Sequence, residues 1–303
     1  MNELSRPMLD SDVDVIASSV WAERIRRMVA EYGREFLPVM NGSFAYSNLR
    51  EGPGQILTCS PYRLWEYASL FLLHDQETPW RRALDVGGAA SPLPYFLAEC
   101  GIPTTAVDLQ PLLVGVCNHV AGVRALPLHA AVEDVTRDSG EDRSYDLVTF
   151  ISVLEHIDVT ARETVLRAIF RRLQPGGLFY LTFDYGQYVE KDPYRSAAGE
   201  ALHRASSIDD IHELCAVVER CGFEFAGNDP RLLPPEILRQ VQAPRARSVM
   251  DRQAANAGVF DSATPWLTIA KYLFRRTFRV AGRRQASRYD HHNFFRMFLR
   301  RPI

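Results

Sequence analysis

The sequence lacks several features that would assign it to a specialised class of protein. It has no run of about 18 apolar residues, which a membrane-spanning helix needs, and no basic-then-apolar signal at its N-terminus. The five cysteines are scattered and form no C-x-x-C pair, so neither a zinc site nor a disulfide framework is indicated. The net charge of −2 provides no overall field that favours nucleic acid or a membrane. We therefore expect a cytoplasmic protein with reduced thiols.

What the sequence contains is an ordinary globular composition, with 47% hydrophobic and 24% charged residues over 303 positions. This length suffices for one large core with additions, or for two domains. The most informative segment is Ala83-Leu-Asp-Val-Gly-Gly88, followed by Asp108 at the end of Thr104-Thr-Ala-Val-Asp108. The pattern predicts a strand, a glycine turn, a helix and a second strand with an acidic end. An acid about 20 residues after such a turn is placed to accept hydrogen bonds from ribose hydroxyls.

The glycine pattern argues against a dinucleotide cofactor. A pyrophosphate site would show G-x-G-x-x-G, but the corresponding positions here are Gly87, Ala89 and Pro92. A nicotinamide-dependent enzyme is therefore a poor interpretation, and a nucleoside cofactor without that pyrophosphate is favoured.

Strands and helices alternate after residue 81, which is typical of right-handed parallel crossovers. Strands are expected at 82–86, 103–107, 125–129, 145–152 and 177–183, then at 223–226 and 293–299. Helices are expected at 92–100, 111–120, 159–173 and 207–221. Before this core, the periodicity predicts helices over 13–32 and 62–74, and after it over 234–242 and 264–284.

Four blocks of this core resemble class I S-adenosylmethionine (SAM)-dependent methyltransferases. They are Ala83–Gly88, Ala106-Val-Asp108, Tyr145–Ile157 and Leu173–Phe179, and their order and spacing match the family over about residues 80–227. The segment 294–302 resembles the family's closing strand. The resemblance implies an α/β fold, namely a Rossmann-like seven-stranded sheet with helices on both faces and an antiparallel last strand. We divide the chain into an N-terminal helical cap or substrate lid (1–80), the SAM-binding core (81–228), a helical insert (229–290) and the closing strand (291–303).

The resemblance also implies which residues hold the cofactor, S-adenosyl-L-methionine. Gly87 and Gly88 would pass under the methionine moiety, Asp85 would order the turn and reach the amino group, and Asp108 would hold the ribose. The remaining candidates are Leu109 against adenine, Val132 and Glu133 after the third strand, Ser152 after the fourth, and Arg63 and Tyr67 on the helix before the core. One departure is that Leu128–Val132 is apolar where the family often has an acid for the adenine amino group.

Methyl transfer from a sulfonium requires alignment of the nucleophile, exclusion of water and, for a protonated nucleophile, a base. The candidates for this role follow the fourth and fifth strands: His156, Asp184 and Tyr185. Histidine is a common general base near neutral pH. For His156, however, a role as a helix cap or packing residue is the favoured interpretation. Glu155 has the same ambiguity, and the alternative interpretation of Asp184 is a solvated turn near Gly186.

Three functions remain open from the sequence. The first is methyl transfer to an oxygen or nitrogen atom of a small-molecule acceptor. The second is non-methyl chemistry on SAM, either cyclisation or aminocarboxypropyl transfer, with release of methylthioadenosine. The third is a non-catalytic SAM-binding protein.

The segments outside the resemblance give fewer indications. A basic stretch between Lys271 and Arg288 is interpreted as a solvated face or as a docking surface for an acidic carrier protein, and nucleic acid is disfavoured. His291 and His292 are adjacent and have no nearby third ligand, so we predict no metal site. The sequence does not indicate the oligomeric state.

Overall fold

A computed structural model gives the arrangement of most of the core. It describes residues 5–8, 12, 15–16, 18–41, 61–73, 80–89, 91–137, 143–185, 208–240 and 293–303. The predicted helix 264–284, the basic stretch and the His291–His292 pair lie outside these residues.

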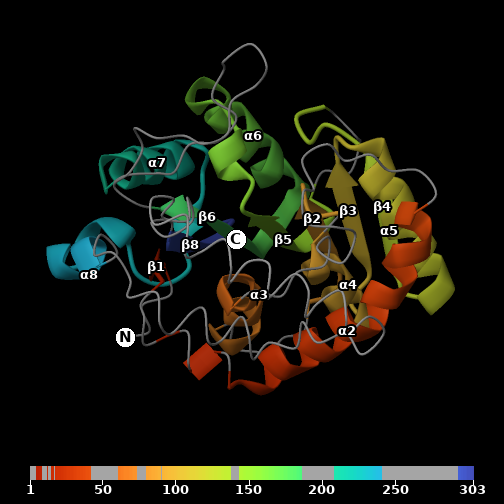
Figure 1. Ribbon diagram of the computed structural model, residues 1–303. Coiled ribbons are helices and arrows are strands. Elements are labelled where there is room, and N and C mark those ends of the chain that lie inside the picture. The colour runs from red at the N-terminus through yellow and green to blue at the C-terminus, as the bar shows by residue number, and fades with distance from the viewer. Residues whose placement is uncertain are drawn as a thin grey trace, which may run out of the picture.

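The centre of the molecule is a sheet whose first five core strands are parallel (Figure 1). The chain enters in the middle of this sheet, moves outward to one edge and then returns to the other side, so the order reverses between β2 and β5. Ligands of such sheets bind outside the carboxyl ends of the strands at this reversal. The five strands are β2 (Ala83–Val86), β3 (Thr104–Asp108), β4 (Leu128–Val132), β5 (Tyr145–Ile151) and β6 (Leu173–Tyr185).

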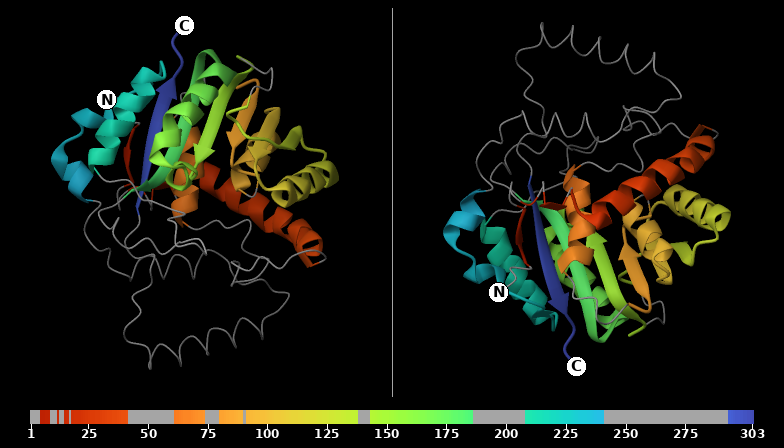
Figure 2. Two further views of the ribbon diagram at one scale, coloured as in Figure 1. Left: turned by 90° about the horizontal axis from the view of Figure 1, so that it is seen from above. Right: turned by 90° about the horizontal axis from the view of Figure 1, so that it is seen from below.

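The last strand, β8 (Asn293–Arg300), runs antiparallel to β6, as the sequence predicts. It also pairs with the short β7 (Glu224–Phe225) and with β1 (Arg6–Pro7), both antiparallel. Figure 2 shows β8 in blue between the red β1 and the green β6. The strand β1 was not predicted, and it adds an eighth strand to the sheet that the described residues form.

Helices cover both faces of the sheet (Figure 1). One face carries α2 (Val20–Asn41), α3 (Pro61–Leu73), α4 (Pro92–Glu99) and α5 (Pro111–Arg124). The other face carries α6 (Val159–Arg172) and α7 (Ile208–Arg220). None of the described helices combines the length and the apolar character that crossing a bilayer requires.

Aromatic packing joins the N-terminal helices to the core. The ring of Trp21 on α2 stacks on Phe71 of α3 at 4.9 Å, and Phe71 meets Phe96 of α4 edge-on at 5.1 Å. Each such pair contributes roughly 1 kcal/mol beyond the apolar area it buries. The helices α2 and α3 are therefore built into one hydrophobic core with the sheet.

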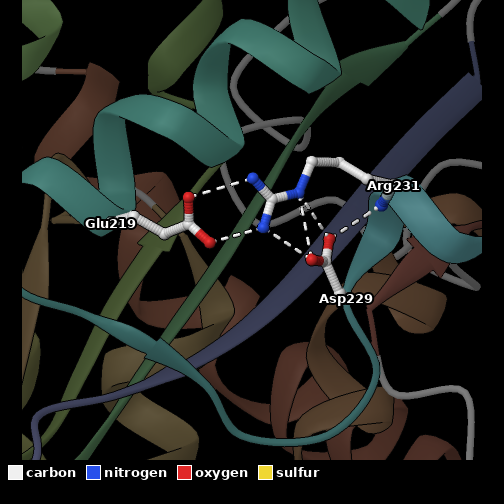
Figure 3. Close-up of polar contacts among 3 residues, drawn as sticks. All are labelled: Glu219, Asp229 and Arg231. Carbon is white, nitrogen blue, oxygen red and sulfur yellow. Dashed lines mark hydrogen bonds and ion pairs between the residues drawn. The ribbon is translucent and has the colours of Figure 1, made fainter.

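An ion-pair cluster attaches the beginning of the predicted insert to the core (Figure 3). Arg231 lies in the short helix η3 (Pro230–Leu232), and its guanidinium contacts both Glu219 of α7 and Asp229. All three nitrogens of this guanidinium donate to the two carboxylates, and these hydrogen bonds fix the direction in which the chain leaves the core. The helix predicted at 234–242 follows as α8 (Pro235–Gln240).

Candidate active site

The glycine turn follows β2 at the reversal point of the sheet. Gly87 has a φ of +75°, a conformation that costs little only for glycine, and its N–H donates to the Val107 carbonyl at 2.7 Å. A Cβ atom on Gly87 would lie 2.8 Å from Cγ2 of Val153. The turn therefore requires glycine both for its backbone angle and for its closeness to the segment after β5.

Asp85 lies buried directly beneath this turn. A Cβ on Gly88 would meet Oδ2 of Asp85 at 1.6 Å, so the carboxyl group occupies the space that a side chain would need. The Thr149 hydroxyl donates to Oδ1, while Oδ2 has no hydrogen-bond partner among the described residues. Burial raises the pKa of Asp85 to about 7, against the lowering effect of Thr149 and with a smaller contribution from the charge of Asp108. A buried carboxyl oxygen of this kind fits a cationic or hydrogen-bond-donating ligand group.

Asp108 ends β3 on the same edge of the sheet. Its Oδ1 accepts from the Gln110 backbone N–H at 2.9 Å, which orients the carboxylate at the strand end. Burial raises its pKa, and hydrogen bonds from the backbone of Gln110, Ala89 and Leu109 oppose that shift. The structure thus brings the predicted acid beside the glycine turn, where it can accept from a pair of hydroxyls.

Two exposed apolar side chains flank Asp108. Leu109 is 69% exposed and Val132, at the end of β4, is 54% exposed. The two strand ends are joined because the Glu133 N–H donates to the Asp108 carbonyl at 3.1 Å. Apolar groups at this edge fit the flat faces of a purine.

The Glu133 side chain is engaged away from this edge. Arg172 at the end of α6 pairs with its carboxylate and also donates to the Val135 and Arg137 carbonyls. Glu133 was predicted to contribute to the cofactor site, but its carboxylate is paired with a buried arginine. Sequence reasoning missed Arg172, which looks like an ordinary basic residue of a helix end.

Ser152 immediately follows β5 and connects the site to α3. Its hydroxyl donates to Oε1 of Glu66 at 2.7 Å, and Glu66 is fully buried. Sequence reasoning chose Arg63 and Tyr67 on that helix and missed Glu66; the signal was a single acid within the mostly apolar stretch 64–73. Tyr67 is buried, and the Arg63 side chain lies outside the described part of the structure.

The catalytic candidates occupy different environments. His156 is exposed at the end of the short helix η2 (Leu154–His156), in which Glu155 is buried. Asp184 is half-buried near the end of β6. Tyr185 is only 1% exposed, donates to the Leu238 carbonyl at 3.2 Å, and has a pKa that burial raises above its ordinary value. A hydroxyl so enclosed is a poor base, and its position favours a packing role.

The fold and the strand-end groups define a domain that binds a nucleoside cofactor at the reversal point of its sheet. Residues 84–181 match the family model described as "Methyltransferase domain". This match and the curated relatives support the class I SAM-dependent methyltransferase family, which the sequence motifs also resemble. S-adenosyl-L-methionine is the cofactor of this family, and the glycine cradle, the buried Asp85 oxygen and the Asp108 carboxylate fit its groups.

Curated relatives match part of the chain. The "Ubiquinone biosynthesis O-methyltransferase" of Xanthomonas euvesicatoria is 36% identical over 137 residues, which is 44% of this chain and 53% of that protein. The protein of the same name from Marinobacter nauticus is 32% identical over 105 residues, covering 34% of this chain and 43% of its own length. The matches thus span about half the length of these relatives or less. A solved structure of MccD protein, 14% identical, superposes with a TM-score of 0.50 over 77% of this chain and 94% of its own and supports the fold.

Proposed function

We propose that this protein is an enzyme that transfers the methyl group of SAM to an oxygen or nitrogen atom of a small-molecule acceptor. The observation that carries the proposal is the meeting of Asp85, the Gly87–Gly88 turn and Asp108 at one edge of the sheet, within the segment that matches the methyltransferase model. The relatives are named O-methyltransferases, which favours oxygen as the acceptor atom.

In this proposal the cofactor-binding groups divide by chemistry. Asp108 accepts from the ribose hydroxyls, Leu109 and Val132 cover the adenine, and Asp85 faces the amino group of the methionine part from beneath the turn. Bound SAM supplies a methyl group already activated on a sulfonium. The protein's task is then to hold the acceptor in line and to exclude water.

The acceptor side of the site is assigned to the ends of β5 and β6. His156 is exposed and Asp184 half-buried, so either group can receive the proton that an acceptor hydroxyl loses. Tyr185 is not used, because its hydroxyl is buried against α8. We assign the enclosure of the substrate to the N-terminal cap (1–80) and the insert (229–290). Docking of an acidic carrier protein on the basic stretch 271–288 and a cytoplasmic location stay predictions.

Mass spectrometry of the purified protein tests this function. The protein is incubated with SAM alone and then with candidate phenols and amines, beside Asp108→Ala. We expect no turnover without an acceptor, then S-adenosylhomocysteine together with an acceptor heavier by one methylene unit. Methylthioadenosine from SAM alone would show the non-methyl chemistry instead. Tight SAM binding without any product would indicate a binding protein.

A further inference from the structure

A buried carboxylate links the N-terminal helices to the ends of β5 and β6. Oε1 of Glu66 accepts from the Ser152 hydroxyl at 2.7 Å and from the Thr182 hydroxyl at 2.5 Å. The Tyr180 hydroxyl donates to the backbone carbonyl of Glu66 at 2.7 Å. Glu66 is 0% exposed, and burying a carboxylate is unfavourable unless several donors compensate for the lost water. The free-energy cost of burying this carboxylate favours a functional role for Glu66.

The residue that Glu66 holds has an unfavourable backbone conformation. Ser152 has a φ of +52°, in the left-handed region that side chains disfavour, and only Ala125 and Arg143 share this among the described non-glycine residues. Its N–H also donates to the Thr182 carbonyl at 3.0 Å. Backbone and side chain of Ser152 are therefore both anchored, and the Glu66 hydrogen bond offsets part of the backbone strain.

The backbone conformation of Ser152 determines the position of Val153. Val153 follows Ser152, and its Cγ2 is the atom that a Cβ on Gly87 would approach to 2.8 Å. The order of contact runs from Glu66 on α3, through Ser152 and Val153, to the glycine turn. Each step is a hydrogen bond, a peptide bond or a packing contact.

We infer that Glu66 is a positioning residue, whose carboxylate keeps Ser152 in the left-handed conformation and thereby holds Val153 against the SAM-binding turn. The inference rests on the proposed function, because the turn is assigned to SAM there. It makes the docking of α3 and the affinity for SAM interdependent. If Ser152 relaxes to an ordinary conformation, only the fraction of molecules with the correct turn binds, and the apparent affinity falls by that fraction.

Two substitutions at position 152 separate this role from simple attachment of α3. Both Ser152→Ala and Ser152→Gly lose the hydrogen bond to Glu66, but only alanine retains the strain of a positive φ. We expect Ser152→Ala to bind SAM roughly fivefold or more weakly than Ser152→Gly, measured by isothermal titration calorimetry. If Glu66 only attaches the helix, the two variants bind equally.

Substitutions of Glu66 supply the complementary measurement. Glu66→Leu removes the acceptor and should weaken SAM binding strongly, while Glu66→Gln keeps a carbonyl oxygen and should retain more affinity. In the Ser152→Gly background the effect of Glu66→Leu should shrink. Glu213→Gln, on the exposed side of α7, is the matched control and should bind as the wild type does.

The outcomes separate the inference from the function on which it depends. A wild-type protein that binds no SAM overturns both. A wild-type protein that binds SAM, with equal affinities for Ser152→Ala and Ser152→Gly, overturns only the role of Glu66. If Glu66→Leu fails to fold, as its melting curve would show, the comparison at position 152 decides alone.

Discussion

The guanidinium of Arg172, in the last turn of α6, pairs with the carboxylate of Glu133, the residue that follows β4. The same group donates to the Arg137 carbonyl at 3.1 Å and to the Val135 carbonyl. Arg172 thus fixes the loop after β4 from behind and turns the first acid of that loop away from the proposed adenine position. In the proposed site, we therefore assign the adenine edge to backbone groups at Val132.

Removing the Arg172 side chain should destabilise the protein considerably. Arg172→Met leaves the Glu133 carboxylate and two carbonyls without their donor, and we expect the free energy of unfolding to fall by about 3 kcal/mol in urea denaturation. The double variant Arg172→Met/Glu133→Gln should recover part of that loss. Arg171→Met, at the exposed neighbouring position, should change stability by less than about 0.5 kcal/mol. Equal effects at 171 and 172 would contradict the interpretation.

The carboxylate of Asp108 should be essential for cofactor affinity. Asp108→Asn keeps the size of the side chain but replaces one acceptor oxygen with a donor, so we expect SAM binding to weaken at least about tenfold in calorimetry, and Asp108→Ala to weaken it further. Asp209→Asn, on the exposed first turn of α7, serves as the control. Retained affinity in Asp108→Ala would remove Asp108 from the cofactor site.

The glycine turn permits a matched comparison with a second glycine. Gly87 and Gly101 both have positive φ angles, +75° and +83°, but a Cβ on Gly101 meets nothing within 4 Å. Gly101→Ala should therefore cost only the backbone strain, about 1 kcal/mol, whereas Gly87→Ala should cost roughly 1–2 kcal/mol more because of Val153. Thermal denaturation measures both. Adding Val153→Ala should reduce the loss of stability that Gly87→Ala causes. If the loss is unchanged, a clash with Val153 is not its cause.

The raised pKa of Asp85 should make stability depend on pH. With a pKa of about 7 in the folded state and 3.8 as the ordinary value, the folded protein binds the proton more tightly than the unfolded chain. The stabilisation that results from the raised pKa of Asp85 is fully present below about pH 4 and is lost as the pH rises toward 7. Between pH 5 and 8 the wild type should lose roughly 2 kcal/mol relative to Asp85→Asn. If the free energies of unfolding of the two proteins, measured with urea, change by the same amount across this pH range, the pKa of Asp85 is not raised.

The core elements could be predicted because their signals are local. The strand at 83–86, the glycine turn and the helix from Pro92 follow one another within ten residues, and each has its own periodicity or punctuation. The strand expected at 125–129 lies instead at 128–132. The reason is that α5 continues to Arg124, Ala125 turns with a φ of +52°, and pairing with β3 begins after Pro127. That register depends on contacts between elements.

The site was predictable only where it follows a motif. Asp85, Gly87, Gly88 and Asp108 lie together as expected. The roles of Glu66 and Arg172 depend on contacts with residues 86 and 39 positions away, and no periodicity reports those. Tyr185 shows the converse: a polar residue after a strand looked like a catalytic group, but its hydroxyl meets Leu238, which no local pattern reveals.

The pairing of β8 has a consequence for how the chain reaches its native state. Met297 and Arg296 lie beside Leu181 and Thr182, and Arg296 also lies beside Arg6, so one strand joins segments from opposite ends of the sequence. Contacts of such long sequence separation carry a large loop-closure entropy and are typical of slow folding. Refolding experiments should therefore show a late step in which the exposed edge of β6 is covered. Until that step, the edge is open to pairing with other chains, and aggregation during refolding should rise with protein concentration.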